Sequence, residues 1–125
     1  MSARDFTIEE ANALLPRLEP LMAQLLEKRA KVVHLRNQIG DSIDDLRIDF
    51  GGSVPSEMVQ DFATIERLIG QIQSHGCVIK SIDAGLLDFL AKHKGRHVYL
   101  CWRYGEPKVA FYHELHKGFG ARRQL

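Results

Sequence analysis

The sequence predicts an α+β fold, in which a long antiparallel helical hairpin precedes a small antiparallel sheet of three to four strands. In the first 75 residues, apolar side chains recur at every third or fourth position, which is the period of a helix with one buried face. After Gly76, short runs rich in β-branched and aromatic residues are typical of strands. The length fits one domain, residues 1–125, with the helical hairpin at about 8–75, a β-meander at about 77–115 and a tail at 116–125.

The first helix has a start signal and two internal prolines. Thr7 and Glu10 form a capping box, in which each side chain accepts a hydrogen bond from the other residue's backbone, so the helix is expected to begin at about Ile8. Pro16 and Pro20 each remove a backbone donor, so we expect a short first helix or a kink before the main rod. The apolar seam of the rod consists of Leu18, Leu21, Leu25, Val32, Leu35 and Ile39.

The second helix is expected to begin near Pro55, which suits a first helical turn, and to end before Gly76. The connection between the helices carries four aspartates within residues 41–49, whose spacing departs from that of a calcium-binding EF-hand loop. We therefore expect an acidic, solvated hairpin tip. The apolar stripe of the second helix consists of Met58, Phe62, Ile65, Ile69 and Ile72.

A β-hairpin is expected over residues 97–114, because Tyr104-Gly105-Glu106-Pro107 supplies a turn between two strand-like runs. One or two further strands are expected within residues 77–90. If the turn is centred on Gly105 and Glu106, alternation places one set of side chains on a core face: Val98, Leu100, Trp102, Val109, Phe111 and His113. The other face then carries His97, Tyr99, Cys101, Arg103, Tyr112 and Glu114.

The two cysteines, Cys77 and Cys101, lie in neither a C-x-x-C pair nor a zinc-finger spacing. We expect two small buried thiols in preference to a zinc knuckle or a disulfide. No apolar run approaches the ~18 residues of a membrane span, and the N-terminus lacks the apolar core of a signal peptide. The chain is therefore expected to be cytoplasmic and not to engage a membrane.

Positive charge is concentrated in the last third of the chain. Residues 91–125 contain eight Lys and Arg against two Glu, whereas residues 1–90 contain nine basic against fourteen acidic residues. Aromatic side chains accompany this charge, a combination that binds single-stranded nucleic acid, although strands of any small sheet are rich in aromatics. A basic end can equally pair with the acidic part of the same or another copy. The residues that would contact nucleic acid are Lys92, Lys94, Arg96, Lys117, Arg122 and Arg123.

No catalytic motif can be recognised, so neither a reaction nor a cofactor is predicted. The sequence contains no readable nucleophile and base pair, phosphate-binding glycine loop or pair of carboxylates. His93 and His97 flank a turn-like Lys-Gly, which argues against a shared helical face. The sheet face opposite the core is either a solvated face with an ion pair or a surface for a small ligand. That surface would be formed by Tyr99, Arg103, Tyr112 and Glu114.

Five segments distributed over the whole chain carry a family resemblance. They are Phe6-Thr-Ile-Glu-Glu-Ala-Asn-Ala-Leu-Leu-Pro16, Gly85-Leu-Leu-Asp-Phe89, Leu100-Cys-Trp-Arg-Tyr-Gly-Glu-Pro107, Tyr112-His-Glu114 and Gly118-Phe-Gly-Ala-Arg122. Together they resemble the domain-of-unknown-function 2203 family of small bacterial proteins. The resemblance implies a fold and a bacterial cytoplasmic setting, but no activity. It also narrows the candidate ligand-binding residues to the polar side chains within these segments: Asp88, Arg103, Glu106, His113, Glu114 and Arg122.

Three functions remain open at this point. The first is a homo-oligomeric interaction module, most simply a dimer with coiled-coil packing, because the helical hairpin carries more apolar surface than one shorter helix covers. The second is a site for a small anionic ligand or a metal, in which Arg103 pairs an anion and His113 is either a candidate metal ligand, with Glu114, or a proton carrier. The third is nucleic-acid binding through the basic last third. The extra apolar stripe of the first function consists of Leu15, Met22, Leu26 and Val33.

Overall fold

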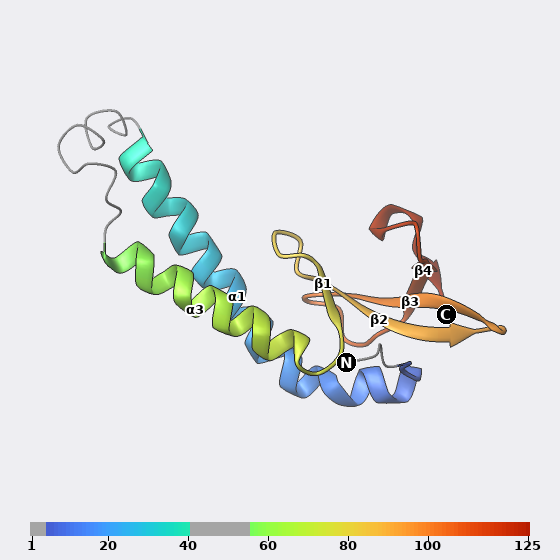
Figure 1. Cartoon of the computed structure of the whole chain (residues 1–125). Helices are drawn as coiled ribbons and strands as arrows, with labels where there is room; N and C mark the ends of the chain where they lie inside the picture. Colours follow the sequence, from blue (N-terminus) through green and yellow to red (C-terminus); the bar gives the residue numbers. More distant parts are fainter. Residues whose placement is uncertain (1–4, 41–55) are drawn as a thin grey trace.

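The computed structural model describes residues 5–40 and 56–125. Helix α1, Ile8–Gly40, and helix α3, Ser56–Gln73, precede a five-stranded sheet (Figure 1). The α+β class is therefore confirmed. The predicted acidic tip, residues 41–49, lies outside the described residues.

Helix α1 begins where the capping box predicts. Thr7 Oγ1 accepts a hydrogen bond from the Glu10 backbone N–H at 3.0 Å, and Glu10 Oε1 accepts one from the Thr7 N–H at 2.9 Å. Pro16 and Pro20 both lie inside one continuous helix, which changes direction within its blue part in Figure 1. The prolines therefore bend the helix without ending it, because each removes one backbone bond and crowds the preceding turn.

Helix α3 packs along α1. The N-terminal end of α3 lies away from the sheet, and its C-terminal end lies near β1 (Figure 1). Lys31 of α1 binds two carboxylates of α3, Glu57 at 2.8 Å and Asp61 at 3.2 Å. The Asp61 side chain is buried between the helices, where Lys28 also approaches it. The residues that link α1 to α3 lie outside the described part of the chain, so the hairpin connection itself stays a prediction.

The sheet is antiparallel throughout, with its five strands in sequence order. The expectation of three to four strands was wrong because the tail adds an edge strand of only two residues, too short to show a period. A single 3-10 turn, Phe119–Ala121, precedes that strand. The strands are β1, Val78–Ser81; β2, Leu86–His93; β3, Arg96–Arg103; β4, Phe111–Glu114; and β5, Arg123–Gln124.

The register between β3 and β4 differs by one residue from the prediction. Val98 pairs with Glu114, and Tyr99 pairs with His113. The cause is the connection, which spans residues 104–110 and is not a two-residue turn. A one-residue change moves every side chain of β4 to the other face of the sheet. His113 consequently leaves the core face and joins the face of Tyr99.

The hydrophobic core lies between the helices and one face of the sheet. Trp102 is fully buried there, and its indole Nε1–H donates to the Glu106 carbonyl oxygen at 3.0 Å. Since successive residues of a strand alternate between faces, the opposite face carries a different set of side chains. The core is built from Leu18, Met22, Leu25, Leu68 and Ile72 of the helices and from Leu87, Phe89, Val98, Leu100, Trp102 and Tyr112 of the sheet.

Much of the apolar stripe that was expected to need a second copy lies in the hydrophobic core of the same chain, which contains residues of both helices and of the sheet. Leu15 and Met22 are buried, and Leu26 packs against the core. Val33 remains 38% exposed. The apolar pattern of the helices alone could not predict this burial, because the strands that complete the core follow both helices in the sequence.

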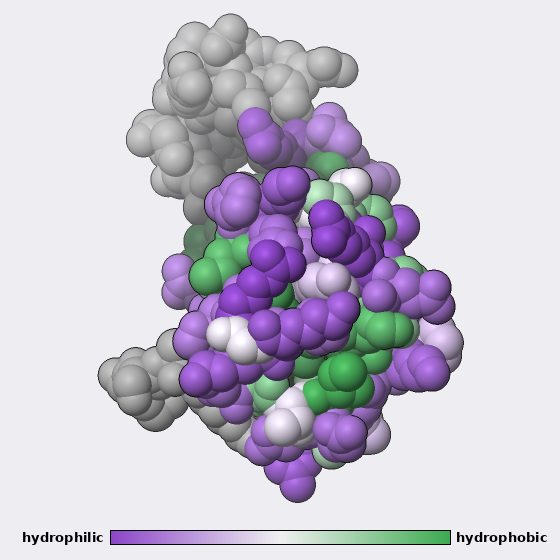
Figure 2. All heavy atoms as spheres, turned by 90° about the vertical axis from the view of Figure 1, so that its right-hand side faces the viewer, coloured by the Kyte–Doolittle hydropathy of each residue, from purple (hydrophilic) through white to green (hydrophobic). Residues whose placement is uncertain are grey.

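The side of the molecule drawn in Figure 2 is mainly hydrophilic, with apolar side chains in small groups. Within residues 5–40 and 56–125, neither helix combines enough length and apolar character to cross a membrane.

Candidate metal centre

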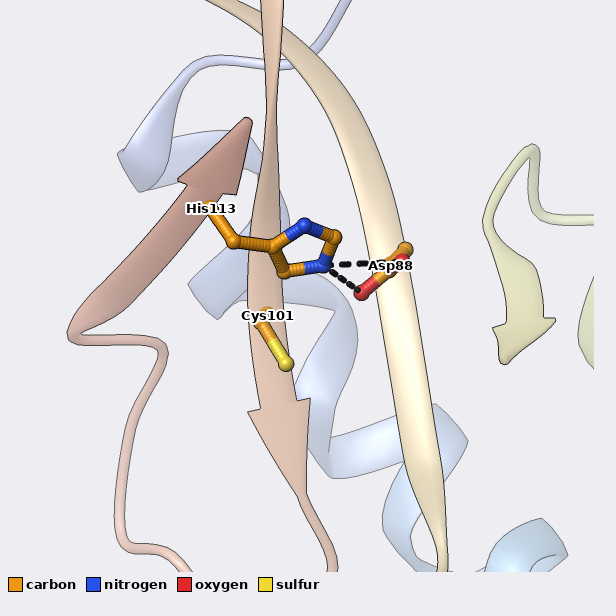
Figure 3. A group of neighbouring side chains, drawn as sticks. All are labelled: Asp88, Cys101 and His113. Atoms are coloured by element: carbon orange, nitrogen blue, oxygen red, sulfur yellow. Dashed lines mark hydrogen bonds and ion pairs between the residues drawn. The ribbon is translucent and has the colours of Figure 1, made fainter. Parts of the chain in front are cut away.

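Three neighbouring strands bring three polar side chains together on the face opposite the core (Figure 3). Asp88 of β2 lies directly opposite Cys101 of β3, and His113 of β4 pairs with Tyr99, two residues away on the same face. Each of the three is only 1% exposed. We refer to Asp88, Cys101 and His113 as the centre. One carboxylate oxygen, the sulfur and one ring nitrogen lie within 4.8 Å of one another.

The hydrogen bonds of His113 place the protons of the centre. Its Nε2 lies 3.1 Å from each carboxylate oxygen of Asp88, and its Nδ1 lies 2.8 Å from the Glu114 carbonyl oxygen. Because a carbonyl oxygen can only accept, Nδ1 carries a hydrogen. A second proton then lies between Nε2 and Asp88, since a carboxylate and a bare ring nitrogen would repel each other. The pair is therefore a protonated unit held between two strands.

Cys101 is a protonated thiol in this arrangement. Burial raises the pKa of Cys101, and the negative charge of Asp88 raises it further. Hydrogen bonding from Arg122 lowers it in part, and the pKa that results is about 12. The imidazole of His113 cannot activate the thiol as a base, because its two nitrogens already face Asp88 and the Glu114 carbonyl. The centre consequently lacks the geometry of a cysteine nucleophile with its general base.

A second group of side chains adjoins Cys101, and we call it the Arg122 clasp. The guanidinium of Arg122 makes two parallel hydrogen bonds to Glu106, at 2.9 and 2.8 Å. It also lies 4.1 Å from the ring centre of Phe111 and 4.2 Å from that of Phe119. Such two-point ion pairs and ring contacts are strong and directional. The clasp consists of Arg122, Glu106, Phe111 and Phe119.

The clasp is electrostatically matched. Partial burial raises the pKa of Glu106, but hydrogen bonds from Arg122 and from the Arg103 backbone outweigh it, so the net pKa lies below its usual range. The hydrogen bonds to Glu106 raise the pKa of Arg122 above its usual range, and contact with the Cys101 sulfur adds to this. Both groups therefore stay charged at neutral pH.

Residues 4–125, which include the centre and the clasp, match one family model, described as "Uncharacterized conserved protein (DUF2203)". The chain belongs to the DUF2203 family. The resemblance found in the sequence is thereby confirmed over essentially the whole chain. No curated protein and no solved structure matches this DUF2203 protein. Since the family description records no activity, the function has to be argued from the centre itself.

The structure of this DUF2203 protein brings four of the six predicted ligand-binding residues to one place. Asp88 and His113 belong to the centre, and Glu106 and Arg122 form the adjoining ion pair. Arg103 contributes its backbone N–H to Glu106 at 2.7 Å, while its guanidinium lies 5.6 Å from the ring centre of Phe119.

Glu114, the second predicted metal ligand beside His113, lies apart from the centre. It alternates to the other face of β4, where its carboxylate binds Arg96 at 2.6 Å. Only its backbone carbonyl oxygen contacts His113. The side chains of His113 and Glu114 therefore do not lie together, and the carboxylate beside His113 is that of Asp88.

Cys101 is the residue that sequence reasoning missed. It was correctly predicted to be a buried, free thiol, as was Cys77. The predicted register placed it on the face opposite His113, so the two were not considered together. A connection between β3 and β4 that includes residues 108–110 would have placed both on one face, but the sequence pattern assigns these residues to the returning strand, which begins only at Phe111.

The basic last third carries less free charge than its composition suggests. Two of the six residues predicted to contact nucleic acid are already in ion pairs, Arg96 with Glu114 and Arg122 with Glu106. His97 is hydrogen-bonded to Asp5 at 3.1 Å, and His93 packs against the ring of Tyr112. Nucleic-acid binding through this part of the chain stays a prediction.

Proposed function

We propose that this DUF2203 protein binds a divalent transition metal, zinc above all, through Asp88, Cys101 and His113. The observation that carries the proposal is the convergence of a carboxylate, a thiol and an imidazole in one buried cluster on three paired strands. These are the three side-chain types that bind zinc in proteins. Cys and His ligands disfavour magnesium and calcium, which prefer oxygen alone.

The orientation of His113 supports the proposal. A metal-binding imidazole usually donates its other ring N–H to a backbone carbonyl or a carboxylate, which fixes the ring and directs the free nitrogen at the metal. Nδ1 of His113 faces the Glu114 carbonyl oxygen in this way, and Nε2 faces Asp88. A cation held between Nε2 and the carboxylate would replace the proton that they share.

The spacing of the donor atoms is compatible with a small tetrahedral ion. Ligand atoms around zinc lie about 3.3–3.7 Å apart, as follows from metal–ligand lengths of about 2.0–2.3 Å. Nε2 and the carboxylate oxygens are at 3.1 Å, and all three donors are within 4.8 Å. Small side-chain rotations therefore suffice to enclose an ion. Three protein ligands leave one position for a water molecule or a small anion, and burial supports binding rather than turnover as the activity.

Cobalt substitution tests the proposal directly. One equivalent of Co²⁺ should give the thiolate-to-cobalt charge-transfer band, and Zn²⁺ should remove it by competition. Cys101→Ser should abolish the band, and Asp88→Asn and His113→Gln should weaken binding by at least about tenfold. Cys77→Ser is the matched control, because Cys77 is also buried and free but does not belong to the group formed by Asp88, Cys101 and His113, and it should keep the band. A wild-type protein that retains neither cation at stoichiometric concentration contradicts the proposal.

A second candidate function, self-association through the helices, is favoured by three exposed apolar side chains. Val33 of α1 is 38% exposed, and Val59 and Phe62 of α3 are 51% and 44% exposed. Burying them in a dimer with coiled-coil packing would remove apolar surface from water. Sedimentation at micromolar concentration should show a dimer that Phe62→Glu weakens, and a wild-type monomer would contradict this candidate.

A further inference from the structure

The centre is enclosed, so a cation needs a way to reach it. Its three side chains are almost without exposed surface. On one side, the sheet packs on the helices through the core, and β2 pairs with β3 along eight residues. Opening either of these would disrupt a large part of the fold. On the other side, the ring of Tyr99 lies beside His113, and the C-terminal segment, residues 115–125, places Arg122 over Phe111, which pairs with Cys101.

The C-terminal segment is attached by few backbone bonds. Strand β5 pairs with β4 at two positions, and beyond it the Leu125 N–H donates to the Ala110 carbonyl oxygen at 2.9 Å. Short edge elements with few hydrogen bonds open at a lower free energy than central strands. This segment can therefore open while β2 and β3 remain paired.

The Arg122 clasp is the main side-chain attachment of the segment. Glu106, which receives Arg122, is itself fixed on the connection between β3 and β4, because its carboxylate accepts the Arg103 N–H and its carbonyl accepts the Trp102 indole N–H. Arg122 is thus held by a rigid partner on one side and by Phe111 of β4 on the other. Removing either charge leaves mainly the two-residue strand pairing to hold the segment.

We infer that residues 115–125 form a gate over Cys101 and its centre, with the Arg122 clasp as the latch that keeps it closed. The latch acts beside the thiol because the Arg122 guanidinium lies over the ring of Phe111, the residue of β4 that pairs with Cys101. Opening it exposes the sulfur first and so admits a divalent cation. The role of the gate in admitting a cation rests on the proposed metal binding. The opening of residues 115–125 over Cys101 does not depend on that proposal.

Thiol labelling tests the gate without any metal. The protein would carry Cys77→Ala, so that Cys101 is the one thiol left, and modification by N-ethylmaleimide would be followed by mass spectrometry under native conditions. Glu106→Gln and Arg122→Met should raise the labelling rate of Cys101 at least about tenfold, because each removes a charge-assisted ion pair. Arg123→Met is the matched control, since it removes the adjacent exposed charge, and it should change the rate less than about twofold.

The outcomes separate the gate from the metal proposal. Equal labelling rates in the two latch variants and the control, all folded by circular dichroism, would overturn the gate. Faster labelling together with faster zinc uptake in stopped-flow mixing would support both the gate and the metal proposal. Faster labelling with no zinc bound would support the gate and overturn the metal proposal.

A measurement on the wild-type protein covers the case in which the latch variants do not fold. Hydrogen exchange should show the Leu125 amide exchanging at least about a hundredfold faster than the amides shared by β2 and β3. Equal protection of these amides would mean that the segment opens only with global unfolding, and that result would overturn the gate.

Discussion

At the scale of single residues, the protons of the centre decide how it can accept a cation. One proton lies between His113 Nε2 and Asp88, and a second sits on Cys101. A divalent cation that replaces both leaves the net charge of the buried cluster unchanged. Burying an uncompensated charge is costly, so this exchange removes the main electrostatic obstacle to binding.

Zinc affinity should therefore rise with pH. Protons compete with the cation, and because burial raises the pKa of Cys101 to about 12, its thiol gives up a proton only on binding. Because the thiol proton of Cys101 competes with the cation, the apparent affinity should increase by up to about tenfold for each unit of pH through the neutral range on account of this residue. Isothermal titration in two buffers with different protonation enthalpies measures the number released. An affinity that does not change between about pH 6 and 8 would contradict the proton count.

The second prediction for single residues concerns the contribution of the Glu106–Arg122 ion pair to stability. Glu106→Gln should lower the free energy of unfolding by about 1.5–3 kcal/mol at neutral pH, because it removes a two-point, partly buried ion pair. The net pKa of Glu106 is below its usual range in the folded protein. Its contribution is therefore complete above the ordinary carboxyl pKa and is lost as the pH falls through the folded value. Urea unfolding should show the wild type and the variant converging in acid, and a constant difference would contradict this.

At the scale of elements, two turns depend on glycine to different degrees. Gly95 follows Lys94, and both have positive φ, as a two-residue hairpin turn between β2 and β3 requires. Gly85 also has positive φ, but an added Cβ there would lie 2.9 Å from the Tyr104 Cβ. Gly95 has open space around it.

Alanine substitutions should separate the cost of backbone strain from the cost of the contact with Tyr104. Gly95→Ala should destabilise by about 1–2 kcal/mol through backbone strain alone, whereas Gly85→Ala should cost more, because the added methyl also displaces Tyr104. Thermal unfolding of both variants measures the difference. Equal losses of stability in the two variants would show that Tyr104 moves away from the added methyl without a cost in free energy.

The elements differ in how far the sequence predicts them. The start of α1 could be predicted because the capping box is local, and β3 and β4 could be predicted from their composition. The register of β4 could not, because a seven-residue connection does not fix pairing as a two-residue turn does. Strand β5 is too short to carry a pattern, and only its partner in β4 defines it.

At the scale of the whole molecule, the site is assembled from strands that are distant in sequence. Asp88 and His113 could be proposed as candidates because they lie in the segments that resemble the family. Cys101 could not be joined to them, because that required the register between β3 and β4. Leu15 and Met22 are also buried in a core that includes residues of the sheet, and a helical period alone does not reveal that burial. A cation at the centre would connect β2, β3 and β4, so zinc binding should raise the midpoint of thermal unfolding.

X-ray absorption spectroscopy of the zinc-loaded protein tests the central claim most directly, because it identifies the atoms around the metal. The spectrum should show one sulfur at about 2.3 Å together with nitrogen and oxygen neighbours at about 2.0–2.2 Å, and Cys101→Ser should remove the sulfur. A spectrum with only nitrogen and oxygen neighbours, or with a sulfur contribution that survives Cys101→Ser, would contradict a centre formed by Asp88, Cys101 and His113.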